Sequence, residues 1–301
     1  RPDLRTGSMN ARSARATLVG IGAVLLWALL ALFTAASGDV PPLQLTAMSF
    51  LVAFLIALAL WILRRRNPLR RLRQPPAAWL LGVTGLFGYH AMYFLALRTA
   101  PVVDASLIAY LWPLLIVLFS ALLPGEQLRW FHLTGAVLGF AGAILIISRG
   151  GLTFAGLSGG YFAAMACALI WSGYSVLNRR FPGVPTDAVG GFCGVTAILA
   201  FGLHLGLEQT VWPETAWQWL AVLGLGLGPV GGAFFLWDHG TKHGDIRVLG
   251  ASAYLAPLIS TVILIAAREA EPTWRIGLAC LLITGGAALA AREMLRRRRP
   301  A

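Results

Sequence analysis

Three polar aromatic side chains lie close together inside a long apolar stretch of the chain. Tyr89, His90 and Tyr93 fall within GYHAMYFLALRTAP, residues 88–101. In a helix Tyr89 and Tyr93 share a face, and His90 lies about 100° around from Tyr89. Polar groups at membrane depth are costly and usually face the interior of a helix bundle. The tyrosines could bond neighbouring helices or contact a ligand. His90 favours a cavity, because lipid exposure would leave both ring nitrogens unpaired.

Tryptophans near the centres of other apolar stretches offer surfaces on which an aromatic ligand could stack. Trp27, Trp112 and Trp171 occupy such positions, and Tyr174 follows Trp171 on the same helical face. A packing role is the alternative for each of these large rings. Other tryptophans lie near the ends of apolar stretches, where an interfacial aromatic belt accounts for them; they are Trp61, Trp79, Trp130, Trp212, Trp217, Trp219 and Trp274.

Two prolines lie at the centres of apolar stretches and predict helix kinks. Pro113 and Pro257 each remove a backbone N–H, which frees the carbonyl four residues earlier, at Ala109 and Ala253. Within a membrane, a freed carbonyl is tolerable only against protein or a wet cavity, where it could accept a hydrogen bond from an ammonium group. The candidate substrate-binding residues are therefore Tyr89, His90, Tyr93, Tyr110, Trp112, Trp171, Tyr174, Trp27 and Tyr254, with Pro113 and Pro257 as hinges.

The elements that must position these residues are membrane-spanning helices. Of the 301 residues 58% are hydrophobic and only 12% are charged, against roughly 25% charged in a soluble protein. A bilayer core of about 30 Å needs roughly 20 apolar residues per helix. The sequence predicts an all-α integral membrane protein with ten transmembrane helices, at residues 16–36, 42–63, 77–98, 102–123, 129–148, 158–178, 187–207, 215–237, 247–267 and 274–293.

The basic residues predict the orientation of these helices. Of 24 Lys and Arg residues, 20 fall on one side of the predicted arrangement and 4 on the other. Because basic loops stay in the cytoplasm, both termini are expected to be cytoplasmic. The net charge of +12 is then matched to anionic lipid headgroups, and no nucleic-acid partner is expected.

Several chemistries lack the residues that they would need. No carboxylate lies at the centre of a predicted span, and Cys167, Cys193 and Cys280 form neither a disulfide framework nor a zinc motif. No metal site, cofactor or catalytic residue is expected. A polar cluster at the end of the eighth span is interpreted as a solvated face or a gate; it comprises Asp238, His239, Lys242, His243 and Asp245.

The sequence repeats itself at a shift of 144 residues. Trp27 then aligns with Trp171, and YLWPL (110–114) with YLAPL (254–258). Five helices per repeat is an odd number, so the second copy enters the membrane from the opposite side. Such inverted repeats are typical of alternating-access carriers, which bind substrate near the bilayer midplane between the halves.

With these features the chain resembles the drug/metabolite transporter superfamily, in its EamA branch of ten-helix carriers. The resemblance rests on the duplicated five-helix unit, on the LxP segments of the fourth and ninth spans, and on the turn PGEQL (124–128). The second half departs from the pattern, with REAEP at 268–272. Within that branch the aromatic helices resemble exporters of aromatic amino acids. Small multidrug exporters of the superfamily use a buried Glu in their first helix, which this chain lacks, so cation–proton antiport of that kind is not expected.

We therefore expect a carrier that exports amino acids with aromatic or large apolar side chains from a bacterium, across its inner membrane. Another small metabolite or a drug remains the alternative substrate, and a membrane enzyme or a channel is disfavoured. The expected partners are the amino acid, the lipid bilayer and a possible second copy in a homo-oligomer. The predicted organisation is an N-terminal tail with a vector-derived start (1–15), two EamA repeats (16–150 and 151–294) and a basic cytoplasmic tail (295–301).

Overall fold

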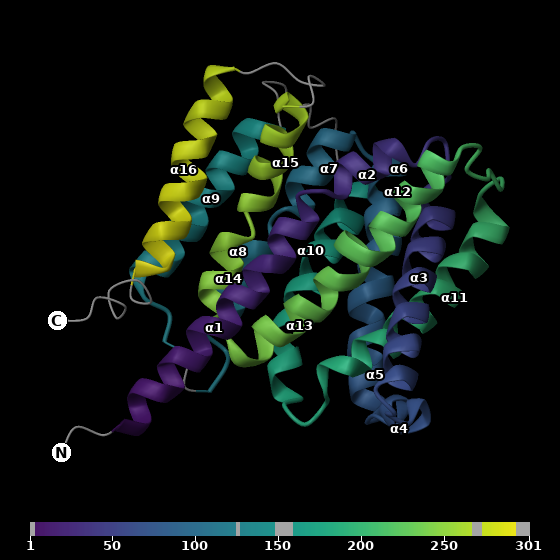
Figure 1. The fold of residues 1–301 in the computed structure, drawn as a ribbon. Coiled ribbons are helices and arrows are strands. Elements are labelled where there is room, and N and C mark those ends of the chain that lie inside the picture. Colours follow the sequence, from purple (N-terminus) through teal and green to yellow (C-terminus); the bar gives the residue numbers. More distant parts are fainter. Residues whose placement is uncertain (1–3, 125–126, 148–158, 267–272, 293–301) are drawn as a thin grey trace.

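The computed structural model describes residues 4–124, 127–147, 159–266 and 273–292 (Figure 1). Over these residues the secondary structure consists of helices, with no strand. Residues 125 and 126 of the PGEQL turn and the segment 268–272 fall outside the described part.

The first half of the chain contains nine α-helical pieces and one π-helical turn in the described ranges. They are α1 (Leu4–Trp27), α2 (Leu30–Ala36), α3 (Pro42–Leu63), α4 (Pro68–Leu72), α5 (Pro76–Val83), π-helix η1 (Thr84–Gly88), α6 (Tyr89–Thr99), α7 (Val102–Ala109), α8 (Trp112–Ser120) and α9 (Trp130–Ile147).

The second half follows a similar order. It contains α10 (Gly159–Leu177), the 3-10 turns η2 (Asn178–Arg180) and η3 (Thr186–Ala188), α11 (Val189–Leu207), α12 (Ala216–Leu227), π-helix η4 (Gly228–Gly232), α13 (Ala233–His243), α14 (Ile246–Ser252), α15 (Leu255–Ala266) and α16 (Trp274–Ala290). In Figure 1, α4 and the start of α1 lie at the lower end of the molecule, and α2, α6 and α7 lie at the upper end. These ends are called the α4 end and the α2 end below.

Several helix starts follow from local sequence. Proline occupies the first position of α3, α4 and α5, where its missing N–H has no helical partner to lose. Thr215 and Gln218 form a capping box at the start of α12. Asp245 caps α14 by accepting from the N–H groups of Arg247 and Val248. Burial would raise the pKa of Asp245, but the hydrogen bonds and charge of Arg247 outweigh it and lower that pKa.

Seven described helical segments are long and apolar enough to cross a membrane. They are Ala11–Ala36, Pro42–Leu63, Pro76–Thr99, Gly159–Arg180, Thr186–Leu207, Ala216–His243 and Ile246–Ile263. Shorter apolar helices cover Asp104–Ser120, Trp130–Leu145 and Trp274–Ala290. All of these lie at places where the sequence predicts spans. The multi-pass, all-helical class is confirmed, whereas the count of ten crossings stays a prediction.

The repeat seen in the sequence is also visible in the irregularities of the helices. The π-helices η1 and η4 start at Thr84 and Gly228, which are 144 residues apart. The break between α7 and α8 at Tyr110 recurs between α14 and α15 at Tyr254, at the same shift. The break between α1 and α2 has no counterpart, since α10 continues through the equivalent residues. The two halves therefore share their internal distortions except in the first helix.

Residues related by the repeat meet one another at the centre of the molecule. A residue can touch its own equivalent only where it lies beside the axis that relates the two copies. Three such pairs are in contact: the Trp27 and Trp171 rings with centroids 5.8 Å apart, the His90 and Phe234 rings at 6.3 Å, and the Tyr254 hydroxyl donating to the Tyr110 carbonyl at 3.2 Å. The centre of the bundle is thus built from equivalent positions of both halves.

Helices α9 and α16 pack against each other through glycines. A Cβ added at Gly286 would lie 2.5 Å from the carbonyl oxygen of Gly135, and one added at Gly135 would lie 2.5 Å from that of Gly286. The backbones can approach this closely only because both residues lack a side chain. Gly135 and Gly286 therefore have a structural role in the contact between α9 and α16.

We expect Gly286→Ala to lower the melting temperature, whereas Gly285→Ala should not. The added methyl of Gly286→Ala must push two backbones apart, and overpacking of this kind costs about 1–3 kcal/mol. The neighbouring Gly285 has open space around an added Cβ, so alanine there is harmless. Thermal unfolding of the purified variants in detergent measures both melting temperatures. Equal melting temperatures for the two variants would contradict the close contact.

Candidate functional site

A small pocket lies at the centre of the molecule, where the repeat-related rings meet. Its cavity volume is about 100 Å³. Both π-helical regions contribute to it, since Tyr89 and His90 follow η1, and Pro229 and Val230 lie in η4. The lining residues are Trp27, Leu30, Tyr89, His90, Tyr110, Trp112, Trp171, Pro229, Val230, Phe234 and Ala256. Six of the nine predicted substrate-binding residues are among them.

His90 is held in the pocket wall by its own helix. Its Nδ1 lies 2.7 Å from the Leu86 carbonyl oxygen, and because a carbonyl only accepts, Nδ1 must carry the proton. The neutral ring then has Nε2 as a hydrogen-bond acceptor. Phe50 and Phe234 pack their rings against the imidazole with centroids at 5.2 Å and 6.3 Å. The π-helical turn η1 precedes His90, and such turns are frequent at functional sites.

Tryptophan rings form one side of the pocket. Trp27 ends α1 and lies edge-on to Trp112 and Trp171, with centroids at 6.0 Å and 5.8 Å. Trp171 in turn packs against Tyr89 at 5.4 Å and Phe234 at 5.5 Å. Edge-to-face and offset contacts of this kind hold the rings in defined orientations.

Trp237 and Phe234 belong to this aromatic cluster and were missed by sequence reasoning. Trp237 is fully buried, lies 5.0 Å from Trp27 and donates from Nε1 to the Ser175 hydroxyl at 3.0 Å. The predicted span ended at residue 237, whereas α13 continues to His243, so Trp237 lies inside the bundle. The shift of 144 that pairs His90 with Phe234 was the signal that could have found Phe234.

Three of the predicted residues lie outside the pocket lining. Tyr93 stacks on Tyr89 with centroids 6.0 Å apart and parallel rings. Tyr174 packs behind Trp171 at 5.2 Å. Tyr254 is fully buried, and its ring fits against Gly139, where a Cβ would clash at 2.5 Å. The expectation that Tyr254 lines the cavity is therefore not met here, because this ring fills the space between helices.

The helices are interrupted just before both predicted hinge prolines. The breaks lie at residues 110–111, before Pro113, and 253–254, before Pro257. The idea that the Ala253 carbonyl is freed is wrong, because Ala256 N–H donates to it at 3.1 Å in a tighter turn. The Tyr110 carbonyl accepts from the Tyr254 hydroxyl. These breaks are thus stabilised within the protein.

A buried polar network lies at the α4 end, between the 3-10 turns η2 and η3 and helix α13. Asp238 accepts hydrogen bonds from Asn178 at 2.8 Å and Thr186 at 2.7 Å, and pairs with Lys242 at 2.9 Å. The Asp238 and Lys242 side chains are 0% and 2% exposed. The interpretation as a solvated face is therefore wrong for these two residues, although His243 is exposed. The network ties η2 and η3 to α13.

A second network lies at the α2 end. Glu208 accepts from the backbone N–H groups of Leu43 and Gln44 at 3.0 Å and 3.1 Å, at the start of α3. His204 contacts the same carboxylate at 3.0 Å, and Arg98 reaches it from α6 at 3.2 Å. His204 therefore has a structural role at this end of the bundle. Over the described residues no group of three or more His, Cys, Asp or Glu side chains could hold a metal ion.

The sequence pattern of the EamA-like transporter family matches the chain twice, over residues 14–148 and 158–292. The chain belongs to this family. The starts of the two matches are 144 residues apart, which is the shift found within the sequence. Members of the EamA-like family are transporters, so the protein is a multi-pass membrane transporter rather than an enzyme.

Relatives of the same family are similar over nearly their whole length. The chain is 51% identical over 278 residues to a protein of Ancylobacter novellus named aromatic amino acid exporter YddG, covering 91% of this chain and 96% of that protein. It is 25% identical over 296 residues to the protein of the same name in Escherichia coli (strain K12), with 91% and 96% covered. A solved crystal structure, 49% identical, matches with a TM-score of 0.87 over 96% of this chain and 100% of that one.

Proposed function

We propose that the protein exports amino acids with aromatic or large apolar side chains by alternating access through the central pocket. The observation that carries the proposal is the pocket itself, in which aromatic rings from both halves surround His90. The similarity to proteins named aromatic amino acid exporters supports the same substrate class.

The pocket offers separate partners for the two ends of such a substrate. Rings such as Trp27 and Trp171 can stack on an aromatic side chain, at about 0.5–1.5 kcal/mol per contact. With Nδ1 committed to Leu86, His90 Nε2 can accept from the substrate ammonium group. The Tyr89 and Tyr110 hydroxyls can donate to its carboxylate. An amino acid satisfies all three requirements at once.

The proposal includes the membrane arrangement. Ten crossings would form two inverted five-helix repeats, with both termini in the cytoplasm of a bacterium and the protein in its inner membrane. The asymmetry of Lys and Arg supports this orientation, and the contacts between repeat-related residues support a two-fold axis through the pocket. The α4 end would then be cytoplasmic.

The conformation supports closure on the cytoplasmic side. Between the pocket and the α4 end lie the buried Trp237 and the Asp238 network, whereas Leu30, which borders the pocket towards the α2 end, is 42% exposed. Pockets for small molecules usually hold roughly 300–1,000 Å³. The cavity of about 100 Å³ must therefore widen before it admits a whole amino acid.

Another small metabolite carried by the same fold is the alternative. Phosphorylated substrates such as nucleotide sugars fit less well, because the pocket lining among the described residues contains no Lys or Arg. A phosphate group that leaves bulk water for the pocket would need a positively charged side chain to stabilise its negative charge.

Transport in proteoliposomes tests the proposal. Vesicles loaded with unlabelled phenylalanine should take up radiolabelled phenylalanine by exchange, and unlabelled tryptophan outside should compete. Glutamate, lysine and a sugar phosphate should not compete, because the pocket has no charge to match theirs. Efflux of phenylalanine from preloaded cells, with and without the protein, checks the direction. Exchange no faster than in protein-free vesicles, or equal competition by glutamate, would contradict the assignment.

A further inference from the structure

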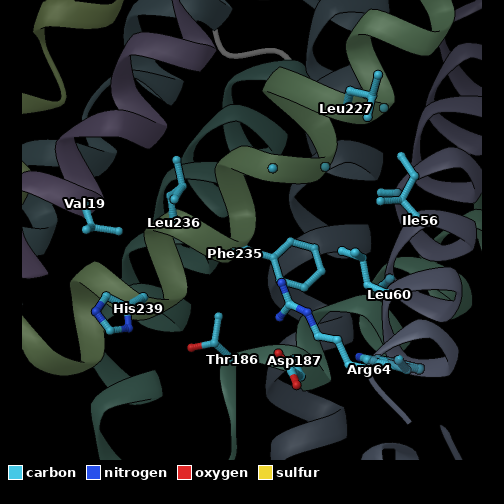
Figure 2. Close-up of a pocket in the computed structure, with 16 residues that line it drawn as sticks. Val19, Ile56, Leu60, Arg64, Thr186, Asp187, Leu227, Phe235, Leu236 and His239 are labelled. Atoms are coloured by element: carbon cyan, nitrogen blue, oxygen red, sulfur yellow. The ribbon is translucent and has the colours of Figure 1, made fainter. Parts of the chain in front are cut away.

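A groove about 500 Å³ in volume runs along the outside of the bundle between α1 and α3, separated from the central pocket by the η4–α13 segment. Its floor is formed by η4 and α13 (Figure 2). Val19, Ile56, Leu60, Phe235 and Leu236 give it apolar walls. Leu60 and Leu227 at its edges are 42% and 59% exposed, so the groove faces the surroundings of the bundle rather than its interior.

The groove has a polar end and an apolar end. Figure 2 shows Arg64, Asp187, Thr186 and His239 at the lower end of the groove and Leu227 at the upper end. Along α3 the lining extends from Ala53 to Arg64, about 16 Å at about 1.5 Å per residue. Half of a hydrocarbon core of about 30 Å is about 15 Å. The groove is thus about as long as one leaflet is deep, and the membrane arrangement proposed above puts its polar end where that leaflet meets water.

A second hollow, strongly basic, adjoins this polar end. It has a volume of about 450 Å³ and is lined by Arg65, Arg66, Asn67, Arg70, Arg71, Gln74 and Pro185. One carboxylate balances part of this charge, since Asp187 pairs with Arg66 and with Arg71 at 3.7 Å. Asp187 also lines the apolar groove, so this carboxylate links the groove to two arginines of the basic hollow.

Two arginines of the basic hollow remain without a carboxylate partner in the described part of the chain, namely Arg65 and Arg70. Arg65 has a left-handed backbone with φ 53°, a conformation that is uncommon outside glycine. It turns the chain at the end of α3, so that consecutive arginines contribute to two different hollows: Arg64 lines the groove, and Arg65 and Arg66 line the basic hollow.

From these observations we propose that the α4 end carries a binding site for one anionic phospholipid of the adjoining leaflet. An acyl chain lies in the groove between α1 and α3, and the phosphate lies among Arg64, Arg65 and Arg70. The apolar walls match the chain in length, and the excess positive charge matches the headgroup. A neutral lipid would fill the groove equally well but would leave the arginines unbalanced.

The site lies directly behind the central pocket. Gly231, Gly232 and Phe235 of the η4–α13 segment line the groove, while Val230 and Phe234 of the same segment line the pocket. A bound acyl chain therefore packs against the back of a wall that contacts the substrate, if the proposed function holds. Lipid binding itself does not depend on that function and can be measured without transport.

Native mass spectrometry of the purified protein with added dioleoyl phosphatidylglycerol or dioleoyl phosphatidylcholine tests the site. The wild type should retain one phosphatidylglycerol more strongly than phosphatidylcholine. The double variant Arg65→Gln/Arg70→Gln should lose roughly 20- to 30-fold in phosphatidylglycerol affinity, as expected for two basic residues at an anionic surface, and with it the preference. The double variant Arg12→Gln/Arg73→Gln removes equal charge from exposed positions outside both hollows and should keep the preference.

The groove is tested separately from the charge. Leu60→Trp should fill it and weaken retention of both lipids, whereas Leu63→Trp, at a 78% exposed position on the same helix, should not. Deacylated glycerophosphoglycerol should fail to displace the lipid, because it lacks the acyl chain. Equal retention of the two lipids by the wild type, displacement by the deacylated headgroup, or equal loss in both tryptophan variants would overturn the proposal.

Discussion

Replacing His90 with alanine is expected to lower exchange of aromatic amino acids by about tenfold to a hundredfold. The ring lines the central pocket, and its bond to the Leu86 carbonyl leaves Nε2 as the acceptor for a substrate ammonium group. A hydrogen bond to a charged group contributes about 1.5–3 kcal/mol, which corresponds to this loss. The amount of folded protein in the membrane should not change, because among the described residues the ring bonds only to its own helical segment, at Leu86.

Two further substitutions separate the roles of the two ring nitrogens. His90→Asn places an amide near Nδ1, keeps the donor to Leu86 and lacks the acceptor at Nε2, so it should be as defective as alanine. His90→Gln can place an amide oxygen near the position of Nε2 and should retain part of the activity. His243→Ala, at an exposed histidine, serves as the control. Wild-type exchange in His90→Asn would show that Nε2 does not contact the substrate.

Tyr93→Ala is expected to reduce exchange less than His90→Ala. The Tyr93 ring stacks on Tyr89 outside the pocket lining, so its loss loosens a ring that lines the pocket. Tyr93→Phe keeps the stack and should be nearly normal. A defect as large in Tyr93→Phe as in Tyr93→Ala would instead assign the role to the hydroxyl.

Replacing Asp238 with alanine is expected to destabilise the protein by about 3–5 kcal/mol, the usual effect of leaving one charge of a buried pair without its partner. Lys242 would remain 2% exposed with its carboxylate gone, and the Asn178 and Thr186 donors would lose their acceptor. For a domain of this size the loss corresponds to a fall in melting temperature on the order of 10 °C. Thermal unfolding in detergent measures it.

A double variant and a surface variant complete this test. Asp238→Leu/Lys242→Met removes both charges at similar volume and should recover much of the stability, because apolar replacements of buried ion pairs are often neutral or better. Asp187→Asn breaks ion pairs at a carboxylate that is 26% exposed. It should lower the free energy of unfolding by only about 0–1 kcal/mol. If the double variant is as unstable as Asp238→Ala, the packing of this region, rather than an unpaired charge, controls stability.

Features that depend only on the order of residues along the chain could be predicted well from the sequence. Apolar length predicted the helical membrane class because each span satisfies its own backbone hydrogen bonds. The shift of 144 residues predicted a duplicated architecture, and it aligned Trp27 with Trp171, whose rings are in contact in the structure. A repeat can be recognised from the sequence alone. Equivalent residues close to the axis that relates the two copies must lie near each other, whatever the details of packing.

Other features depended on how the helices cross. The breaks before Pro113 and Pro257 followed from the missing N–H groups, but proline alone could not show that Ala256 would satisfy the Ala253 carbonyl. Nor could it show that the Tyr254 hydroxyl would reach across to Tyr110. A carbonyl that loses its helical N–H accepts a hydrogen bond from whichever donor lies nearest in space. The sequence around the proline does not specify that donor.

By itself the sequence determined the class of protein, the duplication and most of the pocket residues, since these follow from hydropathy, residue type and period. Only the tertiary structure decided that Trp237 joins the aromatic cluster and that Asp238 is buried with Lys242. It also decided that Tyr254 packs between helices rather than facing the pocket. Whether a polar or aromatic side chain at a helix end is buried depends on neighbours that are distant in sequence, such as Asn178, 60 residues from Asp238, and these are brought together only when the helices pack.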